Sequence, residues 1–348
     1  MPIGTKSSTL DTNDQRMERT SASQSVSLGL QSAAPARLSY VLITPARNEA
    51  AFIENTIKAV VAQTLRPAKW VIVSDGSTDG TDEIVTKYTA DNPWIELMRM
   101  PERRDRNFAG KVHAFNAGYA RVRDMSYDII GNLDADVTFD NSYFDFLIQK
   151  FASDCKLGVA GTPFNEEGHQ YDYRFTSVEH VSGACQMFRR ECFEQIGGYV
   201  PIKTGGVDLV AIVTARMEGW RTRTFLEKTC FHHRKMGTAK RNSLMSGFHG
   251  GYTDYTHGCD LVWEVSRCIY QMTRPPIVLG GSVCLVGYLW ALVTRAHRVV
   301  SADLIQFRKI EQRRRLREFF SKHLHRGERM LSGTSTQRSV RDGTASLK

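Results

Sequence analysis

Short apolar runs alternate with amphipathic stretches between about residues 37 and 245 of this 348-residue chain. LSYVLITPA, KWVIVSD, IELMRM and YDIIGNL each read as a buried strand, and the segment NEAAFIENTIKAVVAQT after the first has apolar residues at helical spacing. Strands that alternate with helices form a mostly parallel sheet covered on both faces. We therefore expect an α/β fold, with ligands bound beyond the carboxyl ends of the strands.

The alternation is confined to the middle of the chain. Residues 1–36 and 325–348 are rich in Ser, Thr, Gln and charge, so we expect both segments to be disordered. We assign the α/β pattern to residues 37–245 and a helical C-terminal region to residues 246–324. Seven cysteines, without a Cys-x-x-Cys pair, indicate reduced thiols in the cytosol. The N-terminal segment has no apolar signal sequence.

Two carboxylates, Asp134 and Asp136, directly follow the apolar run IIGNL. Alternate side chains of a strand face the same way, so these carboxylates would project together and repel each other unless a cation lies between them. One interpretation is a solvated strand end that runs into a turn. The other is a divalent cation site, because hard ions such as Mg²⁺ take oxygen ligands.

Two further strand ends carry polar motifs, TPARNEA at residues 44–50 and SDGSTDGT at residues 74–81. Either motif alone could be an ordinary turn with a helix-capping residue. Neither contains G-x-G-x-x-G or G-x-x-x-x-G-K-[ST], the loops that cradle phosphates in NAD enzymes and P-loop nucleotide hydrolases. The sequence therefore disfavours both of those classes.

Six segments in order resemble the family 2 glycosyltransferases, inverting enzymes with the GT-A fold. They are PARNEA, VIVSDGSTDGT, GKVHAFNAGYA, LDAD, SGACQMFRRECFEQIGGY and GGVDLVAIVTARMEGW, and they extend over about residues 39–237. The resemblance implies a nucleotide-diphosphate sugar as donor and a divalent metal, Mg²⁺ or Mn²⁺, as cofactor.

The resemblance also assigns roles on the donor side of the site. It implies that Asp136 ligates the metal, that Asp134 faces the ribose or the water shell of the metal, and that Asp75 hydrogen-bonds the nucleobase. The remaining donor-binding residues would be Pro45, Arg47, Glu49 and Lys111.

On the acceptor side, inversion needs a general base near the attacking hydroxyl, and the resemblance assigns this role to Asp208. The family has Glu before this aspartate, but here the residue is Val207, which puts the acceptor contacts in doubt. Asp208 could instead be a helix cap. By the same resemblance, the acceptor cleft would be shaped by Gly183, Cys185 and Gln186.

Two adjacent histidines, His232 and His233, follow the last expected strand. In GT-A enzymes a histidine at this place often completes the metal shell, so both are candidate ligands. Adjacent residues of a strand point to opposite sides. We therefore expect at most one of them to bind the metal, and we favour His232.

The expected reaction is transfer of a single sugar to a lipid-linked or glycan acceptor in the biosynthesis of surface polysaccharide or glycolipid. The Q-x-x-R-W motif of processive synthases is absent from the sequence. A polyprenyl-phosphate glycosyltransferase is an alternative with the same fold. A nucleotidyltransferase is disfavoured because its Gly-rich start is missing. A non-catalytic nucleotide-sugar-binding protein is disfavoured because four candidate aspartates are present together.

Residues 275–294 carry no charge and have about the 20-residue length that a bilayer-spanning helix needs. Basic residues flank the segment on both sides, so we expect a re-entrant or monotopic helix, rather than a span, at the cytoplasmic face of the cell membrane. The net charge of +9 favours an anionic partner. We expect anionic lipid and not nucleic acid, because aromatic stacking platforms are not interleaved with the basic residues. A buried helix or a dimer interface is the alternative.

Overall fold

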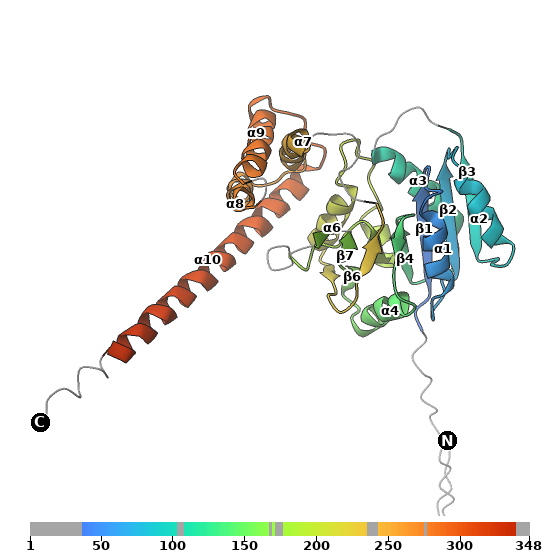
Figure 1. Ribbon diagram of the computed structural model, residues 1–348, viewed down its shortest axis with the longest axis horizontal. Helices are drawn as coiled ribbons and strands as arrows, with labels where there is room; N and C mark the ends of the chain where they lie inside the picture. The colour runs from blue at the N-terminus through green and yellow to red at the C-terminus, as the bar shows by residue number, and fades with distance from the viewer. Residues whose placement is uncertain are drawn as a thin grey trace, which may run out of the picture. The chain divides into compact units, whose positions relative to one another are not determined.

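The computed structural model describes residues 37–102, 108–166, 169–170, 177–234, 243–274 and 277–338 (Figure 1). For residues 169–170, 243 and 322–338 it describes the backbone alone. The N-terminal segment expected to be disordered, residues 1–36, lies outside the described residues.

A seven-stranded sheet forms the centre of the α/β domain, with strand order β10-β6-β9-β4-β1-β2-β3. Neighbouring strands run parallel except at β9, which is antiparallel to both β4 and β6. The expected mostly parallel sheet is therefore confirmed. The strands are β1 (Tyr40–Ala46), β2 (Lys69–Asp75), β3 (Ile95–Met100), β4 (Ile129–Leu133), β6 (Leu157–Gly161), β9 (Cys185–Arg189) and β10 (Arg221–Thr224).

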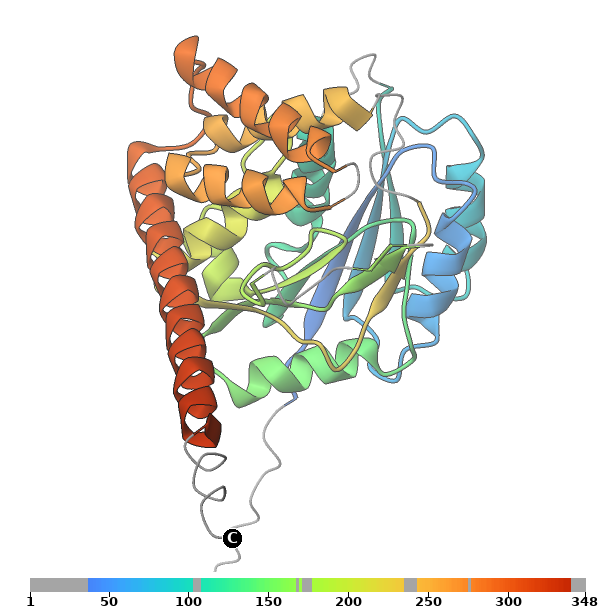
Figure 2. The same cartoon turned by 60° about the vertical axis from the view of Figure 1, so that its left-hand side comes forward.

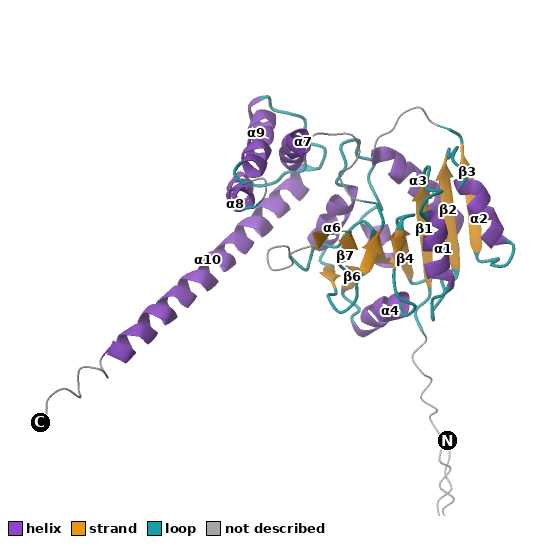
Figure 3. Ribbon diagram, viewed as in Figure 1, coloured by secondary structure: helices purple, strands orange, loops and turns teal. Residues whose placement is uncertain are grey.

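Helices cover both faces of this sheet (Figure 3), so its central strands are apolar on both sides. In β1, Leu42 faces a core that includes Ile57 of α1, whereas Val41 faces a second core that includes Phe115 of α3. This two-sided burial explains why the strands read as continuous apolar runs. The helices of the domain are α1 (Ile53–Val61), α2 (Thr81–Thr89), α3 (Phe108–Val122), α4 (Tyr143–Ser153), α5 (Arg190–Gln195) and α6 (Val207–Met217).

A second, smaller sheet has the strand order β5-β11-β7-β8. Its strands are β5 (Val137–Thr138), β7 (Phe164–Glu166), β8 (His169–Gln170) and β11 (Cys230–His232). β11 pairs with β5 in antiparallel and with β7 in parallel orientation. This sheet brings three distant parts of the sequence together beside the end of β4.

The C-terminal region consists of α7 (Ser243–Thr256), α8 (Leu261–Met272), α9 (Leu279–Val293) and α10 (Ala302–Arg338), seen from a second side in Figure 2. α9 packs against both α7 and α8. The backbones of α8 and α9 approach closely: a Cβ atom added to Gly281 of α9 would lie 2.2 Å from the carbonyl oxygen of Cys268 in α8. Among the described residues, no helix combines the length and the apolar character needed to cross a membrane.

The last helix differs from the sequence expectation. α10 continues to Arg338, into the segment from residue 325 that we expected to be disordered, and residues 339–348 lie outside the described residues. The first turns of α10 are fixed by packing against α6 and α8, with Leu304 buried. Extending an existing helix costs much less than starting one, and no proline interrupts residues 302–338.

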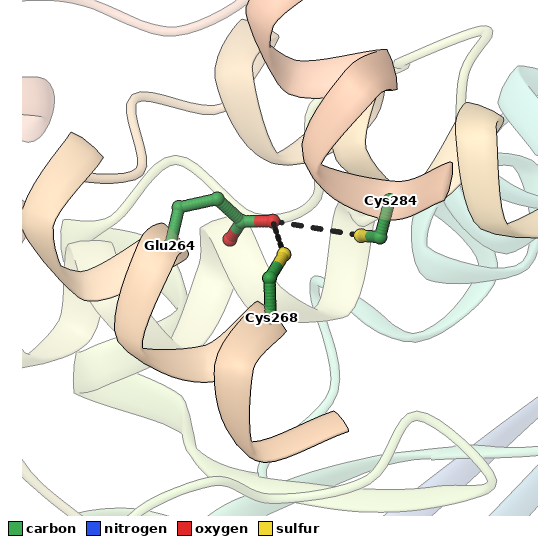
Figure 4. Close-up of side chains that lie close together, drawn as sticks. All are labelled: Glu264, Cys268 and Cys284. Carbon is green, nitrogen blue, oxygen red and sulfur yellow. Dashed lines mark hydrogen bonds between the residues drawn. The ribbon is translucent and has the colours of Figure 1, made fainter. Parts of the chain in front are cut away.

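A buried polar junction joins the helices of this region (Figure 4). The thiols of Cys268 in α8 and Cys284 in α9 both donate to Glu264 Oε1, at 3.4 and 3.5 Å. The three ligand atoms lie within 4.8 Å of one another, a spacing that could hold a metal ion. However, the guanidinium of Arg267 already donates to Glu264 at 2.7 Å and lies 3.3 Å from Cys284 Sγ. Since Arg267 also pairs with Asp254 of α7, we interpret this cluster as a charge-balanced link between the helices.

Candidate active site

The paired aspartates lie in a turn and not on a strand. β4 ends at Leu133, and the chain turns at Asp134–Asp136 before β5 begins. The Asp134 amide donates to the carbonyl of Ala184 at 2.9 Å, and the Val137 amide donates to Thr56 Oγ1 at 3.1 Å. The expectation of strand alternation was therefore wrong. The two carboxylates are nevertheless brought together, because the turn is held by hydrogen bonds at both ends.

His232 lies beside these carboxylates because β11 pairs with β5. The pairing places His232 opposite Val137, the residue that follows Asp136. Its Nε2 lies 3.4 Å from Asp136 Oδ1, and its Nδ1 lies 3.4 Å from Glu166 Oε1 at the end of β7. Within the part of the chain that is described, His232 Nδ1 is buried and makes no hydrogen bond. The ring is therefore held between two carboxylates.

The adjacent histidine points elsewhere. Nε2 of His233 lies 3.0 Å from the hydroxyl of Thr138, and its ring contacts the rings of Phe52 and Phe231. The structure thus brings His232, and not His233, to the two aspartates.

Asp134, Asp136 and His232 form a donor set suited to a divalent cation, with ligand atoms within 4.8 Å of one another. Burial raises the pKa of Asp136, and the neighbouring charge of Asp134 raises it further. Burial also raises the pKa of Glu49 to about 7, against the lowering effect of Arg234. Carboxylates held close together in a buried place favour a bound cation, and two carboxylates with one imidazole suit Mg²⁺ or Mn²⁺. The residues present therefore fit the metal that the resemblance implies.

Fixed positive charge lies next to this acidic group. Lys111 of α3 donates to Asp134 Oδ1. Arg234 donates to Glu49 Oε2 at 2.6 Å, and its Nε lies 3.8 Å from Asp136 Oδ2. These two cations are in place to meet an anionic group of a ligand that reaches the aspartates.

The donor-side motifs after β1 and β2 are connected to each other. The Asn48 amide donates to Ser77 Oγ, and Asn48 Oδ1 accepts from the Thr78 amide at 2.9 Å. The Glu49 amide donates to Thr81 Oγ1. These bonds join the two loops at the carboxyl edge of the sheet, where Pro45 is the last residue but one of β1. They also bring Arg47 Nη1 to 3.6 Å from the buried carboxylate of Asp75.

A cavity of about 260 Å³ opens between the acidic turn and the start of α6. Lys111, Asp134, Asp208 and His232 all line it. Asp208 lies in the first turn of α6 after Gly206, and α6 has no side-chain cap at its N-terminus. The structure therefore does not place Asp208 as a helix cap; its carboxylate belongs to the wall of the cavity.

The three acceptor-side residues have different surroundings. Gly183 lines the cavity, and a Cβ atom added there would lie 3.1 Å from Asp208 Oδ2. Cys185 and Gln186, in contrast, are buried in β9 and do not line this cavity. Gln186 accepts from the hydroxyl of Tyr199 at 2.6 Å. The structure therefore does not bring Cys185 and Gln186 to the wall of this cavity, because β9 is inserted between β4 and β6 with both faces covered.

Two residues near the site were missed by sequence reasoning. Glu166 faces His232, and His180 lines the cavity that contains Asp208. Burial lowers the pKa of His180, against the raising effect of Asp208. Neither residue lies in a recognisable motif. The pairing of β7 with β11 could have revealed Glu166, but that pairing is not visible in the sequence.

Comparison with known proteins extends this picture. Residues 41–197 match the family described as Glycosyl transferase family 2. The poly-beta-1,6-N-acetyl-D-glucosamine synthase of Staphylococcus aureus (strain COL) is 35% identical over 136 residues, which are 39% of this chain and 31% of that protein. The Staphylococcus epidermidis protein of the same name is 28% identical over 140 residues, with the same two coverages. The matched part thus spans about a third of these relatives' length.

Among solved structures, a mannosyltransferase from Pyrobaculum calidifontis, in complex with GDP-Man and Mn²⁺, has a similar fold. It aligns with a TM-score of 0.50 and 20% identity, over 86% of this chain and 84% of that protein. The sequence match and the mostly parallel sheet lead to the same assignment. Residues 41–197 therefore match a family 2 glycosyltransferase domain, and the mostly parallel sheet of the chain fits the GT-A fold of that family.

Proposed function

We propose that this protein transfers a sugar from a nucleotide-diphosphate donor to an acceptor hydroxyl, with inversion at the anomeric carbon and with help from a divalent cation. The observation that carries the proposal is the cavity itself. Asp208 lines it together with Asp134 and His232. Donor and acceptor chemistry can therefore meet in one place.

Asp134, Asp136 and His232 are the residues that would hold Mg²⁺ or Mn²⁺. When bound, the cation would act as a Lewis acid and stabilise the charge that develops on the departing diphosphate. Lys111 and Arg234 supply fixed positive charge beside the same group. Because Lys111 and Arg234 are already held by ion pairs, their side chains need little rearrangement when negative charge develops on the diphosphate.

Asp208 is the proposed general base. Its carboxylate takes the proton of the attacking acceptor hydroxyl while the oxygen bonds to the anomeric carbon from the side opposite the diphosphate. The bond from that carbon to the phosphate oxygen breaks with its electrons, which leaves a nucleoside diphosphate. Gly183 keeps the space beside Asp208 open, since a side chain there would lie against its carboxylate.

We propose a glycan or lipid-linked acceptor and transfer of a single sugar, in polysaccharide or glycolipid biosynthesis. The absence of Q-x-x-R-W from the sequence supports single transfer. A polymerising enzyme is the second candidate, because the curated relatives carry the name of a poly-N-acetylglucosamine synthase. The length of the product made from a short acceptor distinguishes the two.

The test uses the full chain with a panel of nucleotide sugars and Mn²⁺ or Mg²⁺, and it measures both thermal stabilisation and release of nucleoside diphosphate. Asp208→Asn keeps the shape of the side chain but removes its basicity. Turnover should therefore fall by about 10²-fold or more while donor binding persists. Asp91→Asn, at an exposed position, is the matched control. The proposal fails if a donor stabilises the protein without turnover, or if the Asp208→Asn variant turns over like the wild type.

A further inference from the structure

The outward face of α9 is a continuous apolar stripe. Leu279, Val286, Trp290 and Val293 follow one another at helical spacing, with side chains 56%, 56%, 58% and 78% exposed. We call these four residues the α9 stripe. The opposite face of the helix is buried against α7 and α8 and includes Tyr288. α9 is therefore held by its inner face while its outer face is left open to the surroundings.

Further exposed apolar side chains lie on the neighbouring helix α8 and directly before α9. Val262 and Ile269 of α8 are 56% and 58% exposed, and Ile277 and Val278, just before α9, are 67% and 55% exposed. α8 packs directly on α9. Contiguous exposed apolar surface of this kind usually marks a place of interaction with a partner or a membrane.

The exposed charges of the helical C-terminal region have one predominant sign. Arg274 and Arg295, both exposed, lie on either side of the apolar segment. α10 also has the exposed residues Arg313, Arg314 and Arg317, of which Arg313 pairs with Asp260 and Arg314 with Glu318. Across residues 244–274 and 277–321, where side chains are described, the exposed acidic residues are Asp303 and Glu318. The region is therefore complementary to an anionic surface.

We propose that the α9 stripe, with Val262 and Ile269, is the surface by which this protein binds an anionic lipid bilayer. α9 has 15 residues and is about 22 Å long. Lying in the plane of the interface, it would place its apolar side chains at the boundary of headgroups and acyl chains, with Trp290 at the depth where tryptophan is enriched. The arginines would contact anionic headgroups.

The same charges disfavour a second copy of the chain as the occupant of this face. Two copies paired through the α9 stripe would bring basic ends close to basic ends, and like charges at an interface oppose association. Anionic lipid supplies both an apolar layer and negative charge. The proposal involves no step of sugar transfer, so it can fail or succeed independently of the proposed function.

The experiment is flotation of the full chain with vesicles of phosphatidylcholine, with and without phosphatidylglycerol. Binding should be stronger to the anionic vesicles and should weaken with salt. Replacing two residues of the α9 stripe, by Trp290→Glu together with Val293→Glu, should lower the partition coefficient of the protein between vesicles and water by at least about tenfold. The matched control is Leu226→Glu with Val200→Glu, at positions 51% and 49% exposed outside the C-terminal region. Circular dichroism checks that both variants are folded.

Fluorescence gives a second readout that is specific to α9. Lipids brominated in the acyl chain should quench Trp290, and Trp290→Phe should bind vesicles as the wild type does but lose that part of the quenching. The proposal is overturned if the wild type does not float, or if the double glutamate variant floats as well as the control variant. It is also overturned if the wild type is a dimer that ignores vesicles and the double variant is a monomer.

Discussion

His232 is held between two carboxylates, with one ring nitrogen 3.4 Å from Asp136 and the other 3.4 Å from Glu166. In metal sites, a carboxylate behind a ligating histidine fixes the tautomer and orientation of the ring. With Nε2 facing the aspartates, Nδ1 would carry the proton and donate to Glu166. Glu166 would then orient His232 without being a ligand of the cation itself, so it is a positioning residue.

We predict that Glu166→Gln weakens the binding of Mn²⁺ by about 10- to 100-fold, because an amide does not hold the imidazole proton as a carboxylate does. Calorimetric titration of Mn²⁺ in the presence of UDP or GDP measures this directly. Glu227→Gln is the control, since Glu227 pairs with Lys150 and is 57% exposed. An unchanged Mn²⁺ affinity in Glu166→Gln would remove Glu166 from the site.

The opening between Gly183 and Asp208 leads to a second prediction for a single residue. Gly183→Ala would place a Cβ atom 3.1 Å from Asp208 Oδ2, tighter than most such contacts. We expect slower turnover with unchanged donor affinity, because the crowding lies on the acceptor side. The measurement is kcat with the donor found in the panel of nucleotide sugars. A wild-type kcat in Gly183→Ala would contradict the prediction and show that Asp208 can move away from the added methyl group.

The sequence motifs pointed to the aspartates of the site and to Lys111 and His232, which the structure brings near them, but not to Glu166 or His180. Asp136 follows a strand in the motif LDAD, and Asp208 was assigned through the resemblance to family 2. Glu166 reaches the site only through the pairing of β7 with β11. Cys185 is buried because β9 is inserted antiparallel in the large sheet. The sequence pattern of a strand does not show which distant strand it pairs with, so these two placements could not be predicted.

Among the elements, α7 is connected to the loop that leads into α6. His257, just after α7, places Nε2 2.9 Å from the carbonyl oxygen of Gly205 and Nδ1 2.7 Å from that of Thr253. Gly205 and Gly206 have φ values of +96° and +75°, which favour glycine. The helical region thus helps to fix the conformation of the turn before Asp208.

We predict that His257→Ala lowers kcat by about tenfold while the donor dissociation constant is unchanged, because the loop that orients Asp208 loses its hydrogen bond. His257→Gln, which can still donate to the Gly205 carbonyl, should recover part of the loss. Steady-state kinetics with donor titration separates the two effects. Equal losses in both variants, accompanied by a lower melting temperature, would indicate a role in folding only.

Sequence patterns predicted the ends of the C-terminal helices only in part. The apolar segment 275–294 contains α9, whereas the membrane association expected for it stays a prediction. The far end of α10 was not predicted, because composition suggested disorder while helix propagation from a packed start continues to Arg338.

In the molecule as a whole, α10 is tied to the α/β domain by a buried ion pair. Arg216 of α6 donates to both carboxylate oxygens of Glu311, at 2.7 and 2.9 Å, and both side chains are largely buried. Burial alone would raise the pKa of Glu311, but the hydrogen bonds and charge of Arg216 outweigh it, so the pKa lies below its usual value.

We predict that Glu311→Gln lowers the free energy of unfolding at pH 7 by about 2 kcal/mol, because Arg216 is left buried without its charge partner. A carboxylate whose pKa is lowered on folding stabilises the protein fully above the unfolded value of 4.5. That contribution is lost as the pH falls through the lower folded value. Urea unfolding at several pH values should therefore show the difference shrinking below about pH 4.5.

The control for this prediction is Glu318→Gln, since Glu318 pairs with Arg314 at the surface, 3.8 Å apart and more than half exposed on both sides. Its effect should stay below about 0.5 kcal/mol at every pH. A difference between Glu311→Gln and wild type that does not depend on pH would mean that shape, and not charge, sets the stability.

The central claim is that Asp134, Asp136 and His232 form a cation-dependent site for a nucleoside diphosphate. Calorimetric titration of UDP and GDP tests it most directly, with Mn²⁺, with chelator in place of metal, and with Asp136→Asn in the presence of Mn²⁺. We predict that one of the two nucleotides binds the wild type with Mn²⁺, and that both chelator and Asp136→Asn abolish that binding while the melting curve of the free protein is retained. Nucleotide binding that is equally tight with chelator and in the Asp136→Asn variant would contradict the account.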